Sequence, residues 1–236
     1  MKVRSLLLVL LFSSFVVAAN AGDISSFVNL GFSADSRNFM FGIYGVSDKN
    51  SLPHAEAYII NVSHNSFQPG GQLSLSGNRP ISLGQDGSGA LYNILHSIEP
   101  QIAKYKIDHL NLGRLVYVLF NGQEPKANLN FHDFNTGVQY ALTMNQKTRN
   151  SESNKDKVSH RESEFSISLI TTQKDGHEKK FQIGHPGFYR DNVDEYLIRQ
   201  IILSPDEKSL LFVIEKQNRA NNSLSTSYMV ETIDLF

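Results

Sequence analysis

The sequence predicts an all-β protein with one helical insertion near residues 89–105. Short runs rich in aromatic and β-branched residues alternate with turn residues along most of the chain. The composition also suits strands, since the 236 residues include 15 Phe and 9 Tyr. One segment, from Leu91 to Tyr105, instead shows the three- and four-residue apolar spacing of an amphipathic helix.

The N-terminus has the pattern of a secretory signal over residues 1–21. Lys2 and Arg4 precede an apolar run, and Ala19 and Ala21 fit a signal-peptidase site. We therefore expect an exported mature chain, residues 22–236, that forms a single β-rich domain with no further membrane-spanning segment. The chain has no Cys, which excludes disulfides and thiolate metal sites. Its 22 basic and 23 acidic residues lack the basic excess typical of nucleic-acid-binding proteins.

The predicted strands alternate with turns in order along the chain. They cover residues 27–32, 38–44, 55–62, 114–120, 129–134, 139–143, 164–172, 178–183, 198–203, 209–215 and 227–235. A weak further strand is predicted at residues 72–75, within a connection rich in Gly, Ser and Pro. The segment of about 145–163 has Val158 as its only clear apolar residue. We expect a mobile polar loop there, because it cannot bury enough surface to offset the entropy of ordering.

An internal repeat links the two ends of the mature chain. The segment "FSADSRNFMF" at residues 32–41 aligns without gaps with "LSPDEKSLLF" at residues 203–212, which predicts two three-strand meanders over residues 27–62 and 198–235. In each copy, Ser and Asp side chains can accept hydrogen bonds from nearby backbone N–H groups and close a tight corner. We interpret Ser33, Asp35, Ser204 and Asp206 as structural turn residues. A nucleophilic Ser33 would need a Gly-x-Ser-x-Gly elbow followed by a helix.

These segments carry two resemblances. The repeat resembles that of periplasmic β-propellers of the translocation-protein TolB type, and residues 128–143 resemble the outer part of such a blade. This implies antiparallel meanders in a small or irregular β-propeller, with a β-sandwich as the alternative. The segments "FVNLGFSADSRNFMFGIYGV", "AEAYIINV", "GRLVYVLF", "RQIILSPDEKSLLFVIEK" and "SYMVETIDL", in this order, resemble the bacterial family of predicted secreted proteins, domain of unknown function 2259. That resemblance implies export and a single domain, and it carries no activity.

The loop at residues 184–196, "GHPGFYRDNVDEY", concentrates polar side chains between two predicted strands. Loops on rigid scaffolds often carry binding residues, so we interpret it as a candidate binding surface, with a plain connector as the alternative. The candidate binding residues are His185, Tyr189, Arg190, Asp191, Asp194 and Glu195.

The function expected from the sequence is that of a non-enzymatic exported protein, periplasmic or secreted, that binds another envelope protein or has a structural role. No catalytic residues, cofactor or metal are expected, because the sequence has no phosphate-binding glycine loop, no dinucleotide fingerprint and no paired zinc histidines at helical spacing. Nucleic-acid binding is not expected either. The alternative is an exported hydrolase whose site lies in the 184–196 loop.

Overall fold

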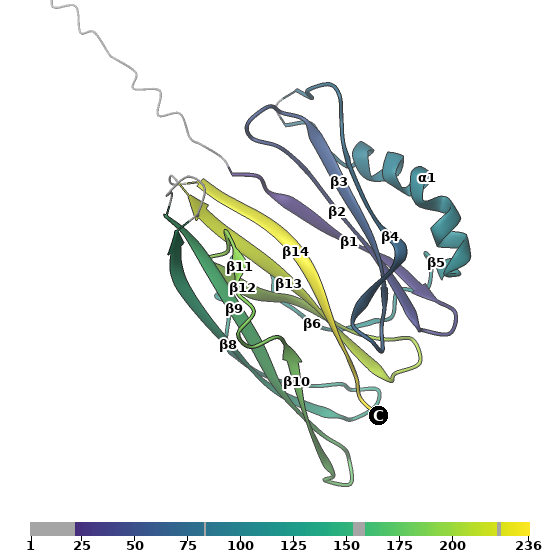
Figure 1. The fold of residues 1–236 in the computed structure, drawn as a ribbon. Helices are drawn as coiled ribbons and strands as arrows, with labels where there is room; N and C mark the ends of the chain where they lie inside the picture. The colour runs from purple at the N-terminus through teal and green to yellow at the C-terminus, as the bar shows by residue number, and fades with distance from the viewer. Residues whose placement is uncertain (1–21, 83, 153–158, 221–222) are drawn as a thin grey trace, which may run out of the picture.

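The chain folds into three antiparallel sheets that are stacked as layers, with one helix on the outside of the stack (Figure 1). The computed structural model describes residues 22–236 except 83, 153–158 and 221–222. The predicted signal segment, residues 1–21, lies outside the described residues. The prediction of an all-β fold with one helical insertion is confirmed.

The N-terminal sheet has five strands in the order β4-β3-β2-β1-β5. The strands are β1 (Ser25–Ser33), β2 (Asn38–Val46), β3 (Pro53–Asn61), β4 (Ser66–Ser76) and β5 (Ile107–Asp108). The first four form an antiparallel meander, whose first three strands are the meander predicted over residues 27–62. β4 is longer than the weak strand predicted at residues 72–75, because pairing with β3 stabilises a Gly- and Ser-rich sequence of low intrinsic strand propensity.

The predicted helix, α1 (Gly89–Lys104), covers the outer face of the N-terminal sheet. Leu91, Ile94 and Ile98 form its buried stripe. A Cβ atom at Gly42 would lie 2.6 Å from the Cδ1 atom of Leu91, so glycine is what allows the helix to approach β2 so closely. Pro100 lies within the helix and does not end it.

The central sheet has four strands in the order β14-β13-β12-β6. The strands are β6 (Arg114–Val118), β12 (Glu195–Leu203), β13 (Ser209–Ala220) and β14 (Ser223–Asp234). Along β13, Leu211 and Val213 pack against the N-terminal sheet, whereas Phe212 and Ile214 pack against the third sheet. Burial on both faces explains why this strand reads as a continuous apolar run and not as an alternating one.

The distal sheet lies on the other side of the central sheet and has the strand order β10-β9-β8-β7, with β11 paired to β9. The strands are β7 (Asn128–His132), β8 (Gln139–Glu152), β9 (Ser159–Thr172), β10 (Glu178–Gly184) and β11 (Arg190–Asp191). The prediction of a mobile loop at about 145–163 is wrong for residues 145–152 and 159–163, which extend the β8–β9 hairpin. Residues 153–158 of the predicted loop lie outside the described residues. Polar cross-strand pairs such as Arg149 with Glu162 replace apolar burial in this part of the hairpin.

The three sheets are stacked in the order N-terminal, central, distal, with the central sheet in contact with both others. The repeat does form two antiparallel meanders, β1-β2-β3 and β12-β13-β14. Within the described residues the sheets form no closed ring, so the β-propeller arrangement is not confirmed. The layered packing is closer to the alternative of a sandwich.

The predicted turn residues lie at the corners between the first two strands of each meander. The Ser33 Oγ donates to Asp35 Oδ1 at 2.6 Å and accepts from the Asn38 N–H at 3.0 Å. In the second copy, the Ser204 Oγ donates to Asp206 Oδ1 at 2.6 Å and accepts from the Ser209 N–H at 2.9 Å. In both corners the residue after the Asp has a positive φ, 59° at Ser36 and 60° at Glu207. The two sequence repeats therefore build the same hydrogen-bonded corner.

Candidate functional site

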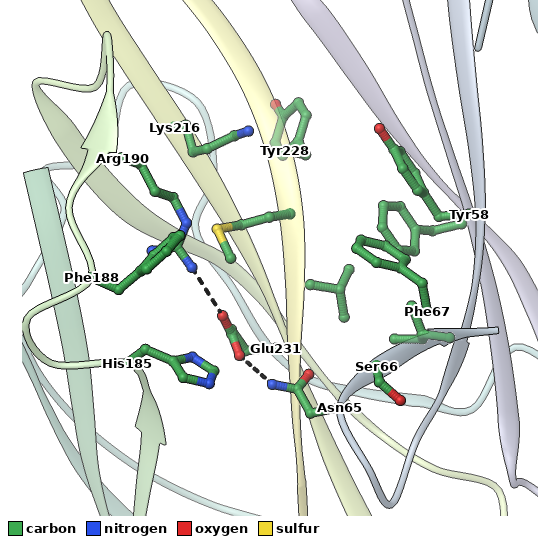
Figure 2. A pocket seen from close by; sticks show the side chains of 14 residues that line it. Tyr58, Asn65, Ser66, Phe67, His185, Phe188, Arg190, Lys216, Tyr228 and Glu231 are labelled. Carbon is green, nitrogen blue, oxygen red and sulfur yellow. Dashed lines mark hydrogen bonds and ion pairs between the residues drawn. The ribbon is translucent and has the colours of Figure 1, made fainter. Parts of the chain in front are cut away.

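A cavity of about 460 Å³ opens beside β14, where the central sheet ends between the two outer layers (Figure 2). We call it the inter-sheet slot. One wall comes from β2, β3, β4 and the turn that precedes β4, and the other comes from Arg190 of β11 and the connection between β10 and β11. The edge strand β14 and Lys216 of β13 complete the lining. Cavities of roughly 300–1,000 Å³ are typical of ligand-binding sites.

The wall on the N-terminal sheet is aromatic. Phe41 and Tyr58 face each other across β2 and β3 with ring centroids 4.9 Å apart, and Tyr58 lies 5.5 Å from Phe67 of β4. The alternation of side chains along each strand places these three rings on the face turned toward the central sheet. Phe67 ends the row and is 51% exposed, so the aromatic wall continues to the surface. Such a wall favours an apolar or aromatic group in the slot.

The opposite wall is built around an ion pair. Arg190 Nη2 lies 3.6 Å from Glu231 Oε1, and the side-chain amide of Asn65 donates to the other oxygen of Glu231 (Figure 2). The Glu231 side chain is 3% exposed and that of Arg190 is 19% exposed. Arg190 Nη1 is buried and has no hydrogen-bond partner within the described part of the chain. The guanidinium of Arg190 also lies against the rings of Phe165 and Phe188, 5.3 and 5.0 Å from their centroids, so aromatic contacts hold it in place.

Lys216 adds a second cation to the slot. It lies beside Tyr228 in the view of the lining residues (Figure 2). Burial lowers the pKa of Lys216 from its ordinary value of 10.5; the carboxylate of Glu56 acts in the opposite direction, and Arg190 lowers it further. No ion pair of the Lys216 ammonium is found among the described residues. The slot thus presents two cationic side chains and one carboxylate, and favours a ligand with negative charge at this wall.

The structure separates the six predicted binding residues into two groups. His185 and Arg190 line the inter-sheet slot, together with Phe188 from the same loop. Asp191 lies 3.5 Å from His160 of β9, on a different part of the surface. The remaining three contact basic side chains of the β8–β9 hairpin and β13: Tyr189 with Arg149, Asp194 with Arg161 and Glu195 with Arg219.

His160, Glu162 and Asp191 form a group whose possible ligand atoms lie within 4.8 Å of one another. His160 and Glu162 are two residues apart on β9, and Asp191 of β11 is the register partner of Glu162. This donor set is suited to zinc, although Arg149 Nε already lies 2.5 Å from Glu162 Oε1. His160 and Glu162 fall in the loop predicted at about 145–163, so neither their strand spacing nor the pairing of β11 with β9 was predicted.

A second cavity, of about 650 Å³, lies between the N-terminal and central sheets near β6. Its polar groups satisfy one another. Glu215 accepts hydrogen bonds from Gln217 at 2.7 Å and from the Tyr228 hydroxyl at 3.1 Å, and lies 3.2 Å from Arg199. Burial, with Glu215 nearby, raises the pKa of Tyr228 to about 12. The inter-sheet slot is the better candidate, because the Lys216 ammonium that lines it has no ion-pair partner among the described residues.

The fold and the slot define a layered all-β protein with a candidate binding cavity at the edge of its central sheet. The family model described as Predicted secreted protein (DUF2259) matches residues 40–234, and the chain belongs to this family. Membership supports export of the chain, as the predicted signal segment indicated. Neither the curated proteins nor the solved structures gave a match. The part of the chain that the structure describes contains no helix long and apolar enough to cross a membrane.

Proposed function

We propose that this exported protein is a non-enzymatic binding module that holds another envelope protein in its inter-sheet slot. The observation that carries the proposal is the pairing of an aromatic wall with two cationic side chains, Arg190 and Lys216, in one cavity. A rigid three-layer scaffold presents both walls, so little ordering is needed when a partner binds. We place the protein in the periplasm, where a partner anchored in the envelope would meet it.

The absence of catalysis is part of the proposal. Glu231 is the only carboxylate among the 14 residues that line the slot, and Arg190 and Asn65 hold it. The cleavage of a glycosidic bond would need a second carboxylate on the opposite side of the substrate. The hydrolase suggested by the 184–196 loop would draw on His185, Tyr189 and Asp191. These residues contact different parts of the structure, since only His185 lines the slot.

Site-specific photo-crosslinking in the cells that make the protein tests this proposal. Phe67 is replaced by p-benzoylphenylalanine, which places a photoreactive group at the mouth of the slot. The matched control carries the same group at Phe134, an 84% exposed position in the turn between β7 and β8. We expect a discrete adduct with an envelope protein from position 67 and none from position 134. The same adducts from both positions, or no adduct from position 67, would overturn the proposal.

A further inference from the structure

The central sheet has an open edge at the slot. Its four strands run in the order β14-β13-β12-β6, so β14 pairs with β13 on one side and with no named strand on the other. β14 is its edge strand beside the slot, and the walls of both outer layers extend beyond that edge. The slot therefore occupies the position that a fifth strand of the central sheet would take.

The backbone of β14 is unpaired along the slot. At one end, the Thr226 N–H donates to the Asp23 carbonyl at 2.8 Å, and at the other end the Thr232 N–H donates to Asn65 Oδ1 at 2.9 Å. Both bonds point away from β13. Because alternate residues of a strand point their N–H and C=O groups to the same side, those of Tyr228 and Val230 also point away from β13. These groups have no hydrogen-bond partner among the described residues.

Unpaired edge groups of this kind are the template for pairing with another strand. A strand added here would be covered on both faces, by the aromatic wall on one side and by Phe188 and Arg190 on the other. Six residue steps separate Thr226 from Thr232, which at about 3.3 Å each span about 20 Å. This length accommodates a segment of about five residues.

We infer that the slot binds an extended polypeptide segment of the partner, which pairs with β14 as the fifth strand of the central sheet. The inference rests on the proposed function and specifies how that same site recognises its partner. Backbone hydrogen bonds to Tyr228 and Val230 would supply affinity without regard to sequence, and the two walls would select alternate side chains.

The two walls define the side chains that the segment needs. Tyr228 and Val230 pack toward the N-terminal sheet, so residues on that face of the added strand meet the aromatic wall and should be apolar. Met229 and Glu231 lie on the opposite face, where Arg190 and Lys216 are found. Residues on that face should be acidic or hydrogen-bonding. The partner segment is therefore an alternating apolar and acidic strand.

The test uses a library of fluorescein-labelled heptapeptides with Val, Ile, Leu, Phe or Tyr at positions 2, 4 and 6, and Asp, Ser or Thr at positions 1, 3, 5 and 7. We expect fluorescence anisotropy with the purified mature protein to identify binders rich in Asp. N-methylation of the best peptide, one residue at a time, then removes single N–H groups. In antiparallel addition, the residues opposite Tyr228 and Val230 turn their N–H groups to β14, and these are the apolar ones. In parallel addition, the polar residues between the apolar ones turn their N–H groups to β14.

We expect N-methylation to weaken binding at least tenfold at alternate positions and less than threefold at the positions between them. Val230→Pro, which removes one edge N–H and no bond to β13, should weaken the unmodified peptide at least tenfold. If that variant does not fold, the N-methyl series still decides, because it uses the unaltered protein. Binding without an alternating pattern, or no binder in the library, would overturn the inference.

Other occupants of the slot give different results. Sodium dodecanoate that binds when no peptide does would indicate a small amphiphile, and concentration-dependent dimers in sedimentation would indicate a second copy of this chain. Either result would overturn the inference that a partner strand occupies the slot. A photo-crosslinked adduct at position 67 without an alternating peptide pattern would refute strand addition and leave the proposed function standing. If neither the adduct at position 67 nor the alternating peptide pattern is observed, both the proposed function and strand addition are refuted.

Discussion

The ion pair between Arg190 and Glu231 joins the distal sheet to the edge of the central sheet, with Nη2 and Oε1 3.6 Å apart. Arg190 is the first residue of β11, and Glu231 lies on β14. Glu231 is almost fully buried, and Asn65 from the turn before β4 binds its other oxygen. One carboxylate therefore connects all three layers at the inter-sheet slot.

Replacement of Arg190 should destabilise the fold, because it leaves the Glu231 carboxylate buried without its cation. We expect Arg190→Met to lower the free energy of unfolding by about 3 kcal/mol. The double variant Arg190→Met/Glu231→Leu should recover part of that loss, since it removes the uncompensated charge. Urea denaturation of the two variants and the wild type measures these differences.

An exposed ion pair serves as the control for this comparison. Arg219 and Glu195 lie 3.3 Å apart with side chains 62% and 33% exposed, so Arg219→Met should change stability by less than about 1 kcal/mol. Equal losses for Arg190→Met and Arg219→Met would contradict a special role for the buried pair.

The two repeated corners should contribute equally to stability. Ser33→Ala and Ser204→Ala each remove a hydroxyl that bonds to both an Asp side chain and a backbone N–H. We expect each to lower the free energy of unfolding by about 1 kcal/mol, as for lost capping groups. Thermal unfolding is the measurement, with Ser97→Ala on the exposed face of α1 as the control. Neither change should affect peptide binding at the slot.

Local patterns in the sequence were sufficient to predict much of the fold. Alternating apolar residues and turn residues predicted the two meanders, and the apolar spacing around Ile94 and Ile98 predicted α1. These features depend on residues close together in the chain. The base of the β8–β9 hairpin was predicted as strands 139–143 and 164–172. Its extension over residues 145–152 and 159–163 was missed, because polar pairs such as Arg149 with Glu162 have no periodic apolar signal.

The candidate site was only partly predictable. The polar loop before β12 indicated His185 and Arg190, which do line the slot. Asn65, Phe67 and Glu231 reach it from other sheets, and the stacking that unites them depends on contacts between residues far apart in sequence. Glu231 was a usable signal, because it lies within the strand predicted at residues 227–235 and follows an apolar run that indicates burial. Lys216 lies one residue beyond the strand predicted at residues 209–215.

Acid should selectively weaken the contact between β6 and the β7–β8 turn. Burial raises the pKa of Asp133, but hydrogen bonds from Arg114 and Thr136 outweigh this effect and lower it from 3.8 to about 2. The lowered pKa stabilises the fold above about pH 4, and that contribution is lost as the pH falls toward 2. At pH 7 we expect Asp133→Asn to be less stable than the wild type by about 2 kcal/mol. Urea denaturation from pH 7 to pH 2 should show the two curves converging; a constant gap would contradict this assignment.

Replacement of Lys216 should weaken peptide binding without lowering the stability of the fold. Burial lowers its pKa from 10.5, so the charged ammonium destabilises the fold at neutral pH, and this effect fades as rising pH deprotonates it in the folded protein. We expect Lys216→Met to be at least as stable as the wild type at pH 7, with the difference narrowing toward pH 10. The same variant should bind Asp-containing peptides at least fivefold more weakly. Lys180→Met, at an exposed position of β10, should change neither property. Thermal unfolding measures the stability of the two variants, and fluorescence anisotropy measures their affinity for the peptides. A Lys216→Met protein that is less stable yet binds normally would contradict a role in binding and assign this lysine a structural role.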